Sequence, residues 1–284
     1  GLCEYLSEHP QVFFSPSEEP HYFSTDFPNH GFRGSDNEYI RTFFSGASDD
    51  HIAVGEGSVF YLYSKTAAEN IREFNSDAKV IAMVRNPIDM CYSYHSQLVY
   101  TGFENIADFY EAWHLQSVRE SGKEISKRCP QPEFLLYGQV CMLGDQVERL
   151  LRVFPKERVM TIVFEDLANN TKEIYEDVLA FLELDSDGRE LFEPVNPNKV
   201  VRSGLVRDFM FAFYRFVGAG VQRVKNITGI RSFGLMRGLM RYNTTCRKRE
   251  PLSESFQSQL KGYFKKDVEK LSQVLGRDLT HWTD

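Results

Sequence analysis

Two runs of consecutive apolar residues are the clearest pattern in the chain. Lys79–Val84 (KVIAMV) and Arg158–Phe164 (RVMTIVF) are each bounded by polar or turn-forming residues. Continuous apolar runs of this length are typical of strands that are buried on both faces, as in a parallel sheet. Shorter apolar segments at Val12–Phe14 and His51–Gly55 predict two further strands.

Segments with helical periodicity alternate with these strands. The sequence predicts the end of a helix at Leu2–His9, a helix opened by Asn86 as N-cap and Pro87 as first residue, and helices at Asn37–Ser45, Thr66–Phe74, Leu135–Phe154, Ile174–Leu182 and Leu252–Leu275. Because strands and helices alternate, we predict an α/β fold with a central parallel sheet flanked by helices.

The pattern changes beyond residue 200, where Arg, Phe and Gly become frequent. Helix-like stretches occur there at 205–217 and 232–241. We therefore expect a single domain over residues 1–284. Residues 1–200 would form its α/β core, and residues 201–284 a helical C-terminal part that serves as a lid.

Composition and charge narrow the classes of function. Of 284 residues, 42% are hydrophobic and 26% are charged, which is ordinary for a globular protein. The formal net charge of −7 argues against a general nucleic-acid-binding protein, which would need a basic face. No apolar run approaches the roughly 18 residues that a membrane span needs, and we expect no signal peptide, because no basic-then-apolar pattern opens the sequence.

The cysteines favour a reducing compartment. Five occur, at scattered positions and with no Cys-x-x-Cys pair or Cys/His cluster at zinc spacing. We interpret them as free thiols and expect a cytoplasmic protein with no bound metal. Three Asn-x-Thr sequences, at Asn169, Asn226 and Asn243, leave the lumen of the secretory pathway as the alternative.

Arg85 is the first candidate for function. It follows the strand Lys79–Val84, and ligands of open parallel sheets bind outside the carboxyl ends of the strands. The helix that starts at Asn86 offers backbone N–H groups to an anion, and Ser93 follows about two turns along it. One phosphate would then bind the guanidinium and the hydroxyl together. In the alternative, Arg85 pairs with Asp89 and Ser93 is an ordinary helix residue.

Polar residues also follow the two short strands. Glu19 and His21, after the first strand, would suit a general base and its helper; the alternative is a solvated acidic loop. Glu56 and Ser58, after the second strand, would line the same cleft, or would belong to a turn before a Tyr-rich core segment that includes Tyr61.

A basic cluster, Arg247-Lys248-Arg249, stands out in this acidic chain. It would bind a phosphate from the side of the C-terminal helical lid, or form a solvated charged face. No GxxxxGK[ST] loop occurs, since Gly122-Lys123 lacks the earlier glycine and is followed by Glu.

In this order, these segments resemble the sulfotransferases that use 3′-phosphoadenosine 5′-phosphosulfate (PAPS), especially the heparan-sulfate-type and the cyanobacterial or bacterial branch. The matching segments are Leu2–Pro10, Glu19-Pro20-His21-Tyr22-Phe23, Gly55-Glu56 with Ser58 and Tyr61–Ser64, Val84-Arg85-Asn86-Pro87 with Ser93 and Tyr94, Leu136-Tyr137-Gly138, Glu165-Asp166-Leu167, and Leu275–Leu279 with Trp282. The resemblance covers nearly the whole chain and implies the sulfotransferase fold, which is similar to that of P-loop nucleotide kinases.

The resemblance also implies roles for individual residues. Arg85 and Ser93 would hold the 3′-phosphate of PAPS, which leaves as 3′,5′-adenosine diphosphate (PAP). Glu19 would be the catalytic base, with His21 beside it. Tyr137 and the cluster Arg247, Lys248 and Arg249 would complete the nucleotide site, and no metal would be needed. The residues that would line the acceptor site are Tyr22, Phe23, Glu56, Ser58 and Tyr61.

Three departures from the family pattern bear on the acceptor and on activity. The loop that binds the 5′-phosphosulfate, with its Lys or Arg, is expected just before Gly1, so we expect this sequence to lack it. Glu18 and Gly57 stand where relatives have Lys, which favours an acceptor that is not a polyanionic sugar. We therefore expect sulfuryl transfer to a hydroxyl or amine of a small or carrier-bound molecule. The alternatives are a binding module without turnover and a P-loop kinase, which would require Mg²⁺.

Overall fold

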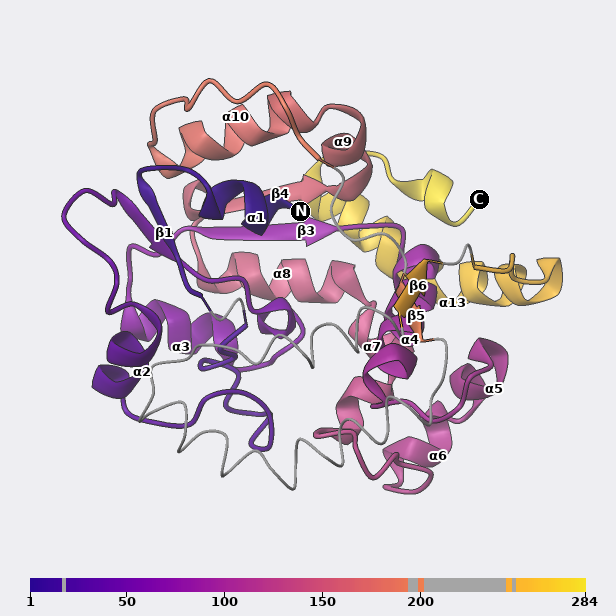
Figure 1. The fold of residues 1–284 in the computed structure, drawn as a ribbon. Helices are drawn as coiled ribbons and strands as arrows, with labels where there is room; N and C mark the ends of the chain where they lie inside the picture. Colours follow the sequence, from indigo (N-terminus) through magenta and orange to yellow (C-terminus); the bar gives the residue numbers. More distant parts are fainter. Residues whose placement is uncertain (17–18, 194–198, 202–243, 247–248) are drawn as a thin grey trace.

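The computed structural model describes residues 1–16, 19–193, 199–201, 244–246 and 249–284 (Figure 1). Several of the predictions lie outside these residues. They concern Glu18, the helix-like stretches 205–217 and 232–241, and two members of the basic cluster, Arg247 and Lys248.

Strands and helices alternate through the described part of the chain, which confirms the predicted α/β class. The strands are β1 (Val12–Phe14), β2 (Ala53–Gly55), β3 (Val80–Val84), β4 (Val159–Val163), β5 (Lys199–Val201) and β6 (Thr244–Cys246). The helices are α1 (Leu2–Ser7), α2 (Asp36–Phe43), α3 (Ala67–Phe74), α4 (Pro87–Thr101), α5 (Phe109–His114), α6 (Gln116–Glu120), α7 (Tyr137–Val140), α8 (Leu143–Val153), α9 (Phe164–Asn169), α10 (Thr171–Leu182) and α13 (Glu254–Leu275). Short 3-10 turns are η1 (Val59–Tyr61), η2 (Pro132–Leu135), η3 (Lys156–Arg158) and η4 (Thr280–Trp282).

The two apolar runs form β3 and β4, which pair in parallel from Val80 opposite Val159 to Val84 opposite Val163. Because side chains alternate between the two faces of a strand, each face of the β3–β4 pair packs against a different set of helices. Ala82 packs with residues of α3 and α8, whereas Ile162 packs with residues of α1, α9 and α10. The strands are therefore covered on both sides, and Figure 1 shows α8 and α10 on opposite sides of them.

The remaining strands form two separate pairs. β1 and β2 pair in parallel, so the predicted parallel sheet consists of two two-stranded pairs in the described residues. β5 and β6 pair antiparallel. β6 falls within residues 201–284, which the sequence pattern predicts to be helical. Its residues, Thr244–Cys246, include two β-branched threonines, which favour strands over helices.

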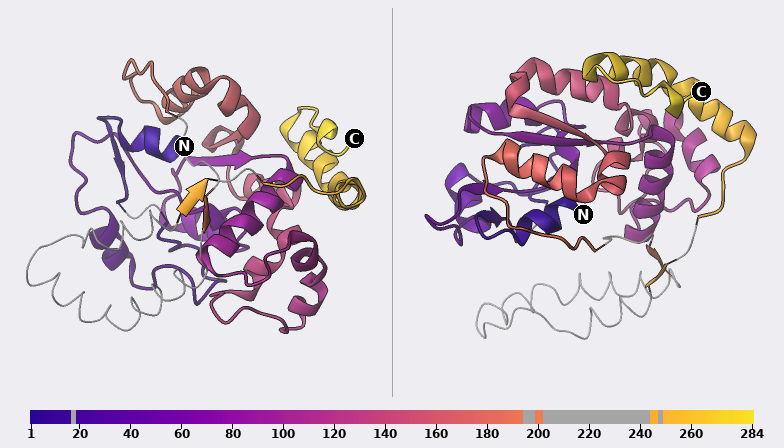
Figure 2. Two further views of the ribbon diagram at one scale, coloured as in Figure 1. Left: turned by 45° about the vertical axis from the view of Figure 1, so that its right-hand side comes forward. Right: turned by 90° about the horizontal axis from the view of Figure 1, so that it is seen from above.

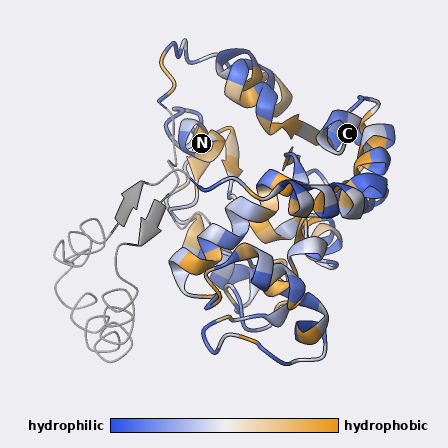
Figure 3. Ribbon diagram, turned by 90° about the vertical axis from the view of Figure 1, so that its right-hand side faces the viewer, coloured by the Kyte–Doolittle hydropathy of each residue, from blue (hydrophilic) through white to orange (hydrophobic). Residues whose placement is uncertain are grey.

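Helix α13 is the predicted C-terminal helix, and it forms one wall of the main core. Its residues Phe256, Phe264 and Leu271 are buried with Val84 and Val163 of the strands. Figure 2 shows α13 running beside α8. The hydropathy colouring in Figure 3 shows that the helices carry hydrophobic and hydrophilic residues in alternation, as amphipathic helices that pack through one face do.

The single long helix predicted at Leu135–Phe154 is wrong. The segment is divided into η2, α7 and α8, with breaks at Leu136 and Met142. The cause is tertiary: the buried carboxylate of Asp267, on α13, accepts hydrogen bonds from Gly144 N (2.8 Å) and Asp145 N (2.9 Å). This side chain caps α8 from another element, and a carboxylate at a helix N-terminus is stabilising.

Other differences follow from helix length. The short helices α5, α6 and α9 were not predicted, because five or six residues hold too few turns for a periodic pattern. Among the described residues, no helix is both long and apolar enough to cross a membrane.

Candidate active site

Arg85 and Phe164 lie side by side because each directly follows a strand. Val84 and Val163 are partners in the parallel pair β3–β4, so the next residues leave it at the same edge. The guanidinium carbon of Arg85 lies 4.7 Å from the centre of the Phe164 ring, within the range of a cation–π contact. The ring thus holds the guanidinium at the carboxyl end of the strands.

Helix α4 begins beside Arg85 as the sequence predicts. The Asn86 side chain accepts a hydrogen bond from Ile88 N (2.9 Å), and Pro87 is the first helical residue. The free N–H groups of this first turn and the helix dipole favour an anion there. Ser93 lies two turns along the same helix and is half-buried.

The ion pair between Arg85 and Asp89 leaves the guanidinium available. Arg85 Nη2 and Asp89 Oδ2 are 3.8 Å apart, and the Asp89 side chain is 62% exposed. An exposed pair at this spacing contributes only a few tenths of a kcal/mol. Arg85 Nε is buried and has no hydrogen-bond partner in the part of the chain that the structure describes.

Arg249 is the described member of the basic cluster, and it approaches Arg85 from the far end of the sequence. Its guanidinium carbon lies 5.3 Å from the centre of the Tyr92 ring on α4, and Tyr92 donates a hydrogen bond to the Glu250 carbonyl (2.9 Å). Burial and the positive charge of Arg85 lower the pKa of Arg249. Arg249 Nη1, like Arg85 Nε, is buried without a partner among the described residues. Two neighbouring cations with unpaired N–H groups form a site that suits a phosphate.

Glu19 and His21 contact each other directly. His21 Nε2 lies 3.0 Å from Glu19 Oε2; the His21 side chain is 3% exposed and the Glu19 side chain 43%. Because an ionised carboxylate can only accept, Nε2 carries the proton when His21 is neutral. The imidazole thereby orients one carboxylate oxygen and leaves the carboxylate partly open to solvent.

Residues that follow β2 form hydrogen bonds that hold the backbone of this pair. Ser58 Oγ accepts a hydrogen bond from His21 N (2.8 Å), and Ser58 N donates to Glu56 Oε2 (2.8 Å). The other oxygen of Glu56 accepts hydrogen bonds from the hydroxyls of Tyr39 (3.2 Å) and Tyr61 (2.5 Å). Glu56, Ser58 and Tyr61 therefore hold the polypeptide around His21.

Tyr22 and Phe23 belong to the same aromatic cluster. Tyr22 stacks on Tyr39, with ring centres 4.2 Å apart, and its hydroxyl bonds to Asp36 (2.5 Å). Phe23 is buried and packs against Tyr61. The structure brings all five predicted acceptor-site residues together, and the contacts it gives them are internal.

A chain of ring contacts joins the two halves of the candidate site. The His21 ring centre lies 5.5 Å from that of Phe60, which stacks on Phe134 (4.0 Å) and also contacts Tyr94 on α4 (6.1 Å). Tyr94 neighbours Ser93. The Glu19–His21 pair and the helix that begins beside Arg85 are therefore packed into one framework.

Tyr137 has internal partners. Its side chain is fully buried, and its hydroxyl donates to Glu104 Oε2 (2.5 Å). Arg119 Nη1 lies 2.8 Å from the same oxygen, and both charged side chains of this ion pair are 0% exposed. The structure thus gives the Tyr137 side chain a place in the core behind α4 and no surface for a nucleotide.

Replacing Glu104 by glutamine should destabilise the protein. Removing one partner of a buried ion pair leaves the Arg119 charge uncompensated, which costs about 3–5 kcal/mol. Urea unfolding at neutral pH would measure the loss. The matched control is Glu111→Gln, at an exposed position on α5, which should change the free energy of unfolding by less than about 0.5 kcal/mol. A loss below about 1 kcal/mol in Glu104→Gln would contradict this expectation.

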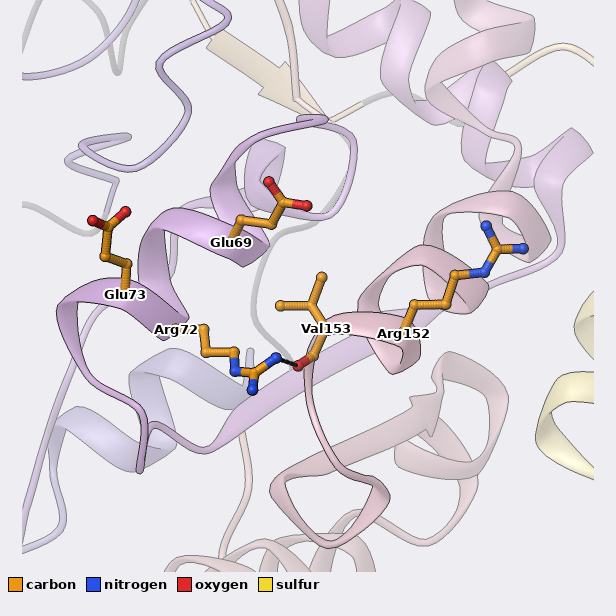
Figure 4. A pocket seen from close by; sticks show the side chains of 5 residues that line it. All are labelled: Glu69, Arg72, Glu73, Arg152 and Val153. Atoms are coloured by element: carbon orange, nitrogen blue, oxygen red, sulfur yellow. Dashed lines mark hydrogen bonds between the residues drawn. The ribbon is translucent and has the colours of Figure 1, made fainter.

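Two surface hollows lie away from these residues. One hollow, of about 400 Å³, lies between α3 and α8, where Arg72 donates a hydrogen bond to the Val153 carbonyl (Figure 4). The residues that line it are Glu69, Arg72, Glu73, Arg152 and Val153. The other, of about 520 Å³, lies along α13 beside the last residues of the chain. Neither contains a predicted site residue. No group of three or more potential metal ligands occurs among the described residues.

Phe164 is the contact that the sequence analysis missed. The resemblance included the residues directly after it, Glu165-Asp166-Leu167, but assigned Phe164 no role. A signal was present: Phe164 is the last residue of the predicted strand Arg158–Phe164, Arg85 directly follows the predicted strand Lys79–Val84, and parallel strands bring such positions to one edge.

Comparisons with known proteins bear on the fold and on the family. Residues 67–203 match the family model described as the sulfotransferase domain. No match was found among curated protein sequences. Among solved structures, the chain is similar to a sulfotransferase from Alicyclobacillus acidocaldarius, with a TM-score of 0.68 and 24% identity. That similarity covers 100% of this chain and 93% of the other, and at this identity it shows the fold.

Proposed function

We propose that the protein transfers a sulfuryl group from PAPS to a hydroxyl or amine of a small or carrier-bound acceptor, because residues 67–203 match the family model of the sulfotransferase domain. The observation that carries the proposal is the pairing of Arg85 and Arg249 at the start of α4. Each guanidinium has a buried N–H group without a described partner, and the charge of Arg85 lowers the pKa of Arg249.

Arg85, Ser93 and Arg249 would hold the 3′-phosphate of the donor. A phosphate between the two guanidinium groups offsets their mutual repulsion and accepts the unpaired N–H donors. The first turn of α4 adds backbone N–H groups and the positive end of its dipole. Phe164 keeps Arg85 in place through its ring. We propose the same role for Arg247 and Lys248 on the basis of the family resemblance.

Bound PAPS supplies an activated sulfuryl group with a phosphate as its leaving group. Glu19 would accept the proton of the acceptor hydroxyl or amine. Its partial exposure leaves the carboxylate within reach of an acceptor, whereas His21 donates to Oε2 and fixes its direction. The aromatic cluster with Glu56 keeps His21 in position. Positioning of this kind accounts for much of the rate of a group transfer.

The acceptor class follows from charge. A net charge of −7, with Glu19 at the centre of the site and Gly57 where heparan-type relatives have Lys, disfavours a polyanionic sugar. On the family resemblance, we propose that the aromatic cluster of Tyr22, Phe23 and Tyr61 borders the acceptor site, where it would suit a small hydroxylated or carrier-bound molecule. We propose that no metal takes part, because the arginines and the helix dipole handle the charge.

Two broader proposals accompany this function. We propose that residues 1–284 form one domain, because α13 completes the core built on β3 and β4. We also propose a cytoplasmic location. The described residues Cys91, Cys129 and Cys141 are free thiols, as expected in a reducing compartment.

A calorimetric titration would test the function. PAP should bind at least about 30-fold more tightly than 5′-AMP, because only PAP carries the 3′-phosphate that two guanidinium groups would bind, and each charge-assisted hydrogen bond contributes about 1.5–3 kcal/mol. Equal affinities for PAP and 5′-AMP would contradict the assignment. ATP with Mg²⁺ serves as the comparison ligand: tighter binding of ATP than of PAP would favour a kinase instead.

A further inference from the structure

The backbone at His21 is held in an unfavourable conformation. His21 has φ of +50°, in the left-handed region that few residues other than glycine adopt, and it is 2% exposed. Such a conformation costs about 1–3 kcal/mol and persists only where the surroundings impose it. The structure therefore contains contacts that fix His21 and, through it, the direction of Glu19.

Arg33 provides one of these contacts and binds four more carbonyls of the same loop. Its Nη1 donates to the carbonyls of His21 (3.0 Å) and Phe32 (2.7 Å). Its Nη2 donates to those of Ser24 (2.9 Å) and Phe27 (2.6 Å), and also to that of His30. One guanidinium thus donates hydrogen bonds to five backbone carbonyls of residues 21 to 32. Partial burial lowers the pKa of Arg33, although the residue as a whole is exposed.

The spacing of these carbonyls shows why one side chain can reach them. Phe27 N donates to the Ser24 carbonyl (3.1 Å) and His30 N to the Phe27 carbonyl (3.0 Å). Ser24 Oγ donates to the His21 carbonyl (3.0 Å). Successive turns of three residues therefore direct the carbonyls of 21, 24, 27 and 30 to a common centre, which the Arg33 guanidinium occupies.

Two further residues of this loop act on His21 itself. The His30 ring lies against the His21 ring, with centres 4.3 Å apart, and burial lowers the pKa of His30 to about 4, so that it is neutral near pH 7. Gly31 has φ of +90°, and a Cβ there would lie 2.5 Å from His21 Cβ. The loop backbone at Gly31 and the His30 ring are therefore both packed closely against His21.

We propose that Arg33 is a positioning residue for the Glu19–His21 pair: by binding the carbonyls of the 21–32 loop it imposes the His21 backbone conformation that brings Nε2 to Glu19. The role of Glu19 rests on the proposed function, whereas the effect of Arg33 on His21 rests on the geometry of the loop alone. Arg33 touches neither reactant in this scheme, and it acts on the reaction only through His21.

The test compares Arg33→Gln and Arg33→Lys with Arg149→Gln. Arg149 is a control, because its guanidinium also donates to backbone carbonyls, those of Leu62 (2.8 Å) and Tyr63 (3.1 Å), outside this loop. Three quantities are measured in each protein: the ¹⁵N shifts of the His21 ring, the kcat and KM of sulfuryl transfer, and the affinity for PAP. A His21→Gln variant assigns the ring signals.

In the native protein His21 should show the tautomer protonated at Nε2. Arg33→Gln should lose this preference and lower kcat about 100-fold, as misplacement of a reacting group by about 1 Å does, with PAP affinity unchanged within about twofold. Arg33→Lys keeps a cation but lacks the several N–H donors of a guanidinium. It should therefore recover only part of the lost kcat. Arg149→Gln should keep the His21 tautomer and change kcat less than about threefold.

An unchanged His21 ring in Arg33→Gln, or a kcat that falls no further than in Arg149→Gln, would overturn the proposal. If Arg33→Gln does not fold, Arg33→Lys carries the same criteria. Failure of the native protein to bind PAP would contradict the proposed function instead, and the His21 ring would still report whether Arg33 positions it.

Discussion

Replacing Arg85 by alanine is expected to weaken the binding of PAP by about two orders of magnitude. The substitution removes a guanidinium that the Phe164 ring holds at the carboxyl end of β3 and that supplies an unpaired buried N–H. Loss of one or two charge-assisted hydrogen bonds corresponds to about 3 kcal/mol, or roughly 100-fold in affinity. Calorimetry at a fixed ionic strength would measure it, because binding between charges depends on salt.

The control for this variant is Arg158→Ala. Arg158 also flanks a strand of the same pair, but it precedes β4 at the opposite edge, where it binds Asp77 (2.8 Å). Its removal should leave the affinity for PAP unchanged within about twofold. Similar binding by the native protein and by Arg85→Ala would remove Arg85 from the nucleotide site, and with it the main support for the proposed donor.

Replacing Glu19 by glutamine should lower the rate of sulfuryl transfer by a factor of about 10² to 10⁴, which is the usual contribution of a general base. Glutamine keeps the size of the side chain and can still accept a hydrogen bond from His21 Nε2, so the loop should keep its conformation. Binding of PAP should not change, because its 3′-phosphate would lie with Arg85. Transfer from radiolabelled PAPS, followed together with calorimetry, separates the two effects.

Glu69→Gln provides the comparison for Glu19. This exposed carboxylate lines the hollow between α3 and α8, which contains none of the predicted site residues. We expect transfer by Glu69→Gln to equal that of the native protein within experimental error. Undiminished turnover in Glu19→Gln would assign the proton transfer to His21. A loss of turnover in Glu69→Gln would contradict the placement of the active site at Glu19.

Some features of the site were already determined by the sequence. The continuous apolar runs identified β3 and β4, and their parallel pairing follows from the alternation of strands and helices. Asn86 and Pro87 marked the beginning of α4, and Arg85 was therefore expected where a strand ends and a helix N-terminus begins. These are short-range properties, because runs of apolar residues and helix caps depend on neighbouring residues in the chain.

Other features depended on residues that are distant in sequence. Arg249 meets Tyr92, and Asp267 caps α8 and divides the helix predicted at Leu135–Phe154. Tyr137 was expected at the nucleotide site on the family resemblance, but Glu104 gives it a partner in the core. No local pattern reports such contacts, since they form only when separate elements pack together.

Thus the sequence alone determined the strands β1 to β4, the start of α4 and the residue types at these strand ends. The tertiary structure decided which of these side chains meet. It placed Phe164 on Arg85 through the β3–β4 register and directed five carbonyls to Arg33, an isolated arginine in a loop that carries no sequence signal. The physical reason is range: backbone propensity and periodicity act over a few residues, whereas the burial and pairing of charges depend on the whole packed core.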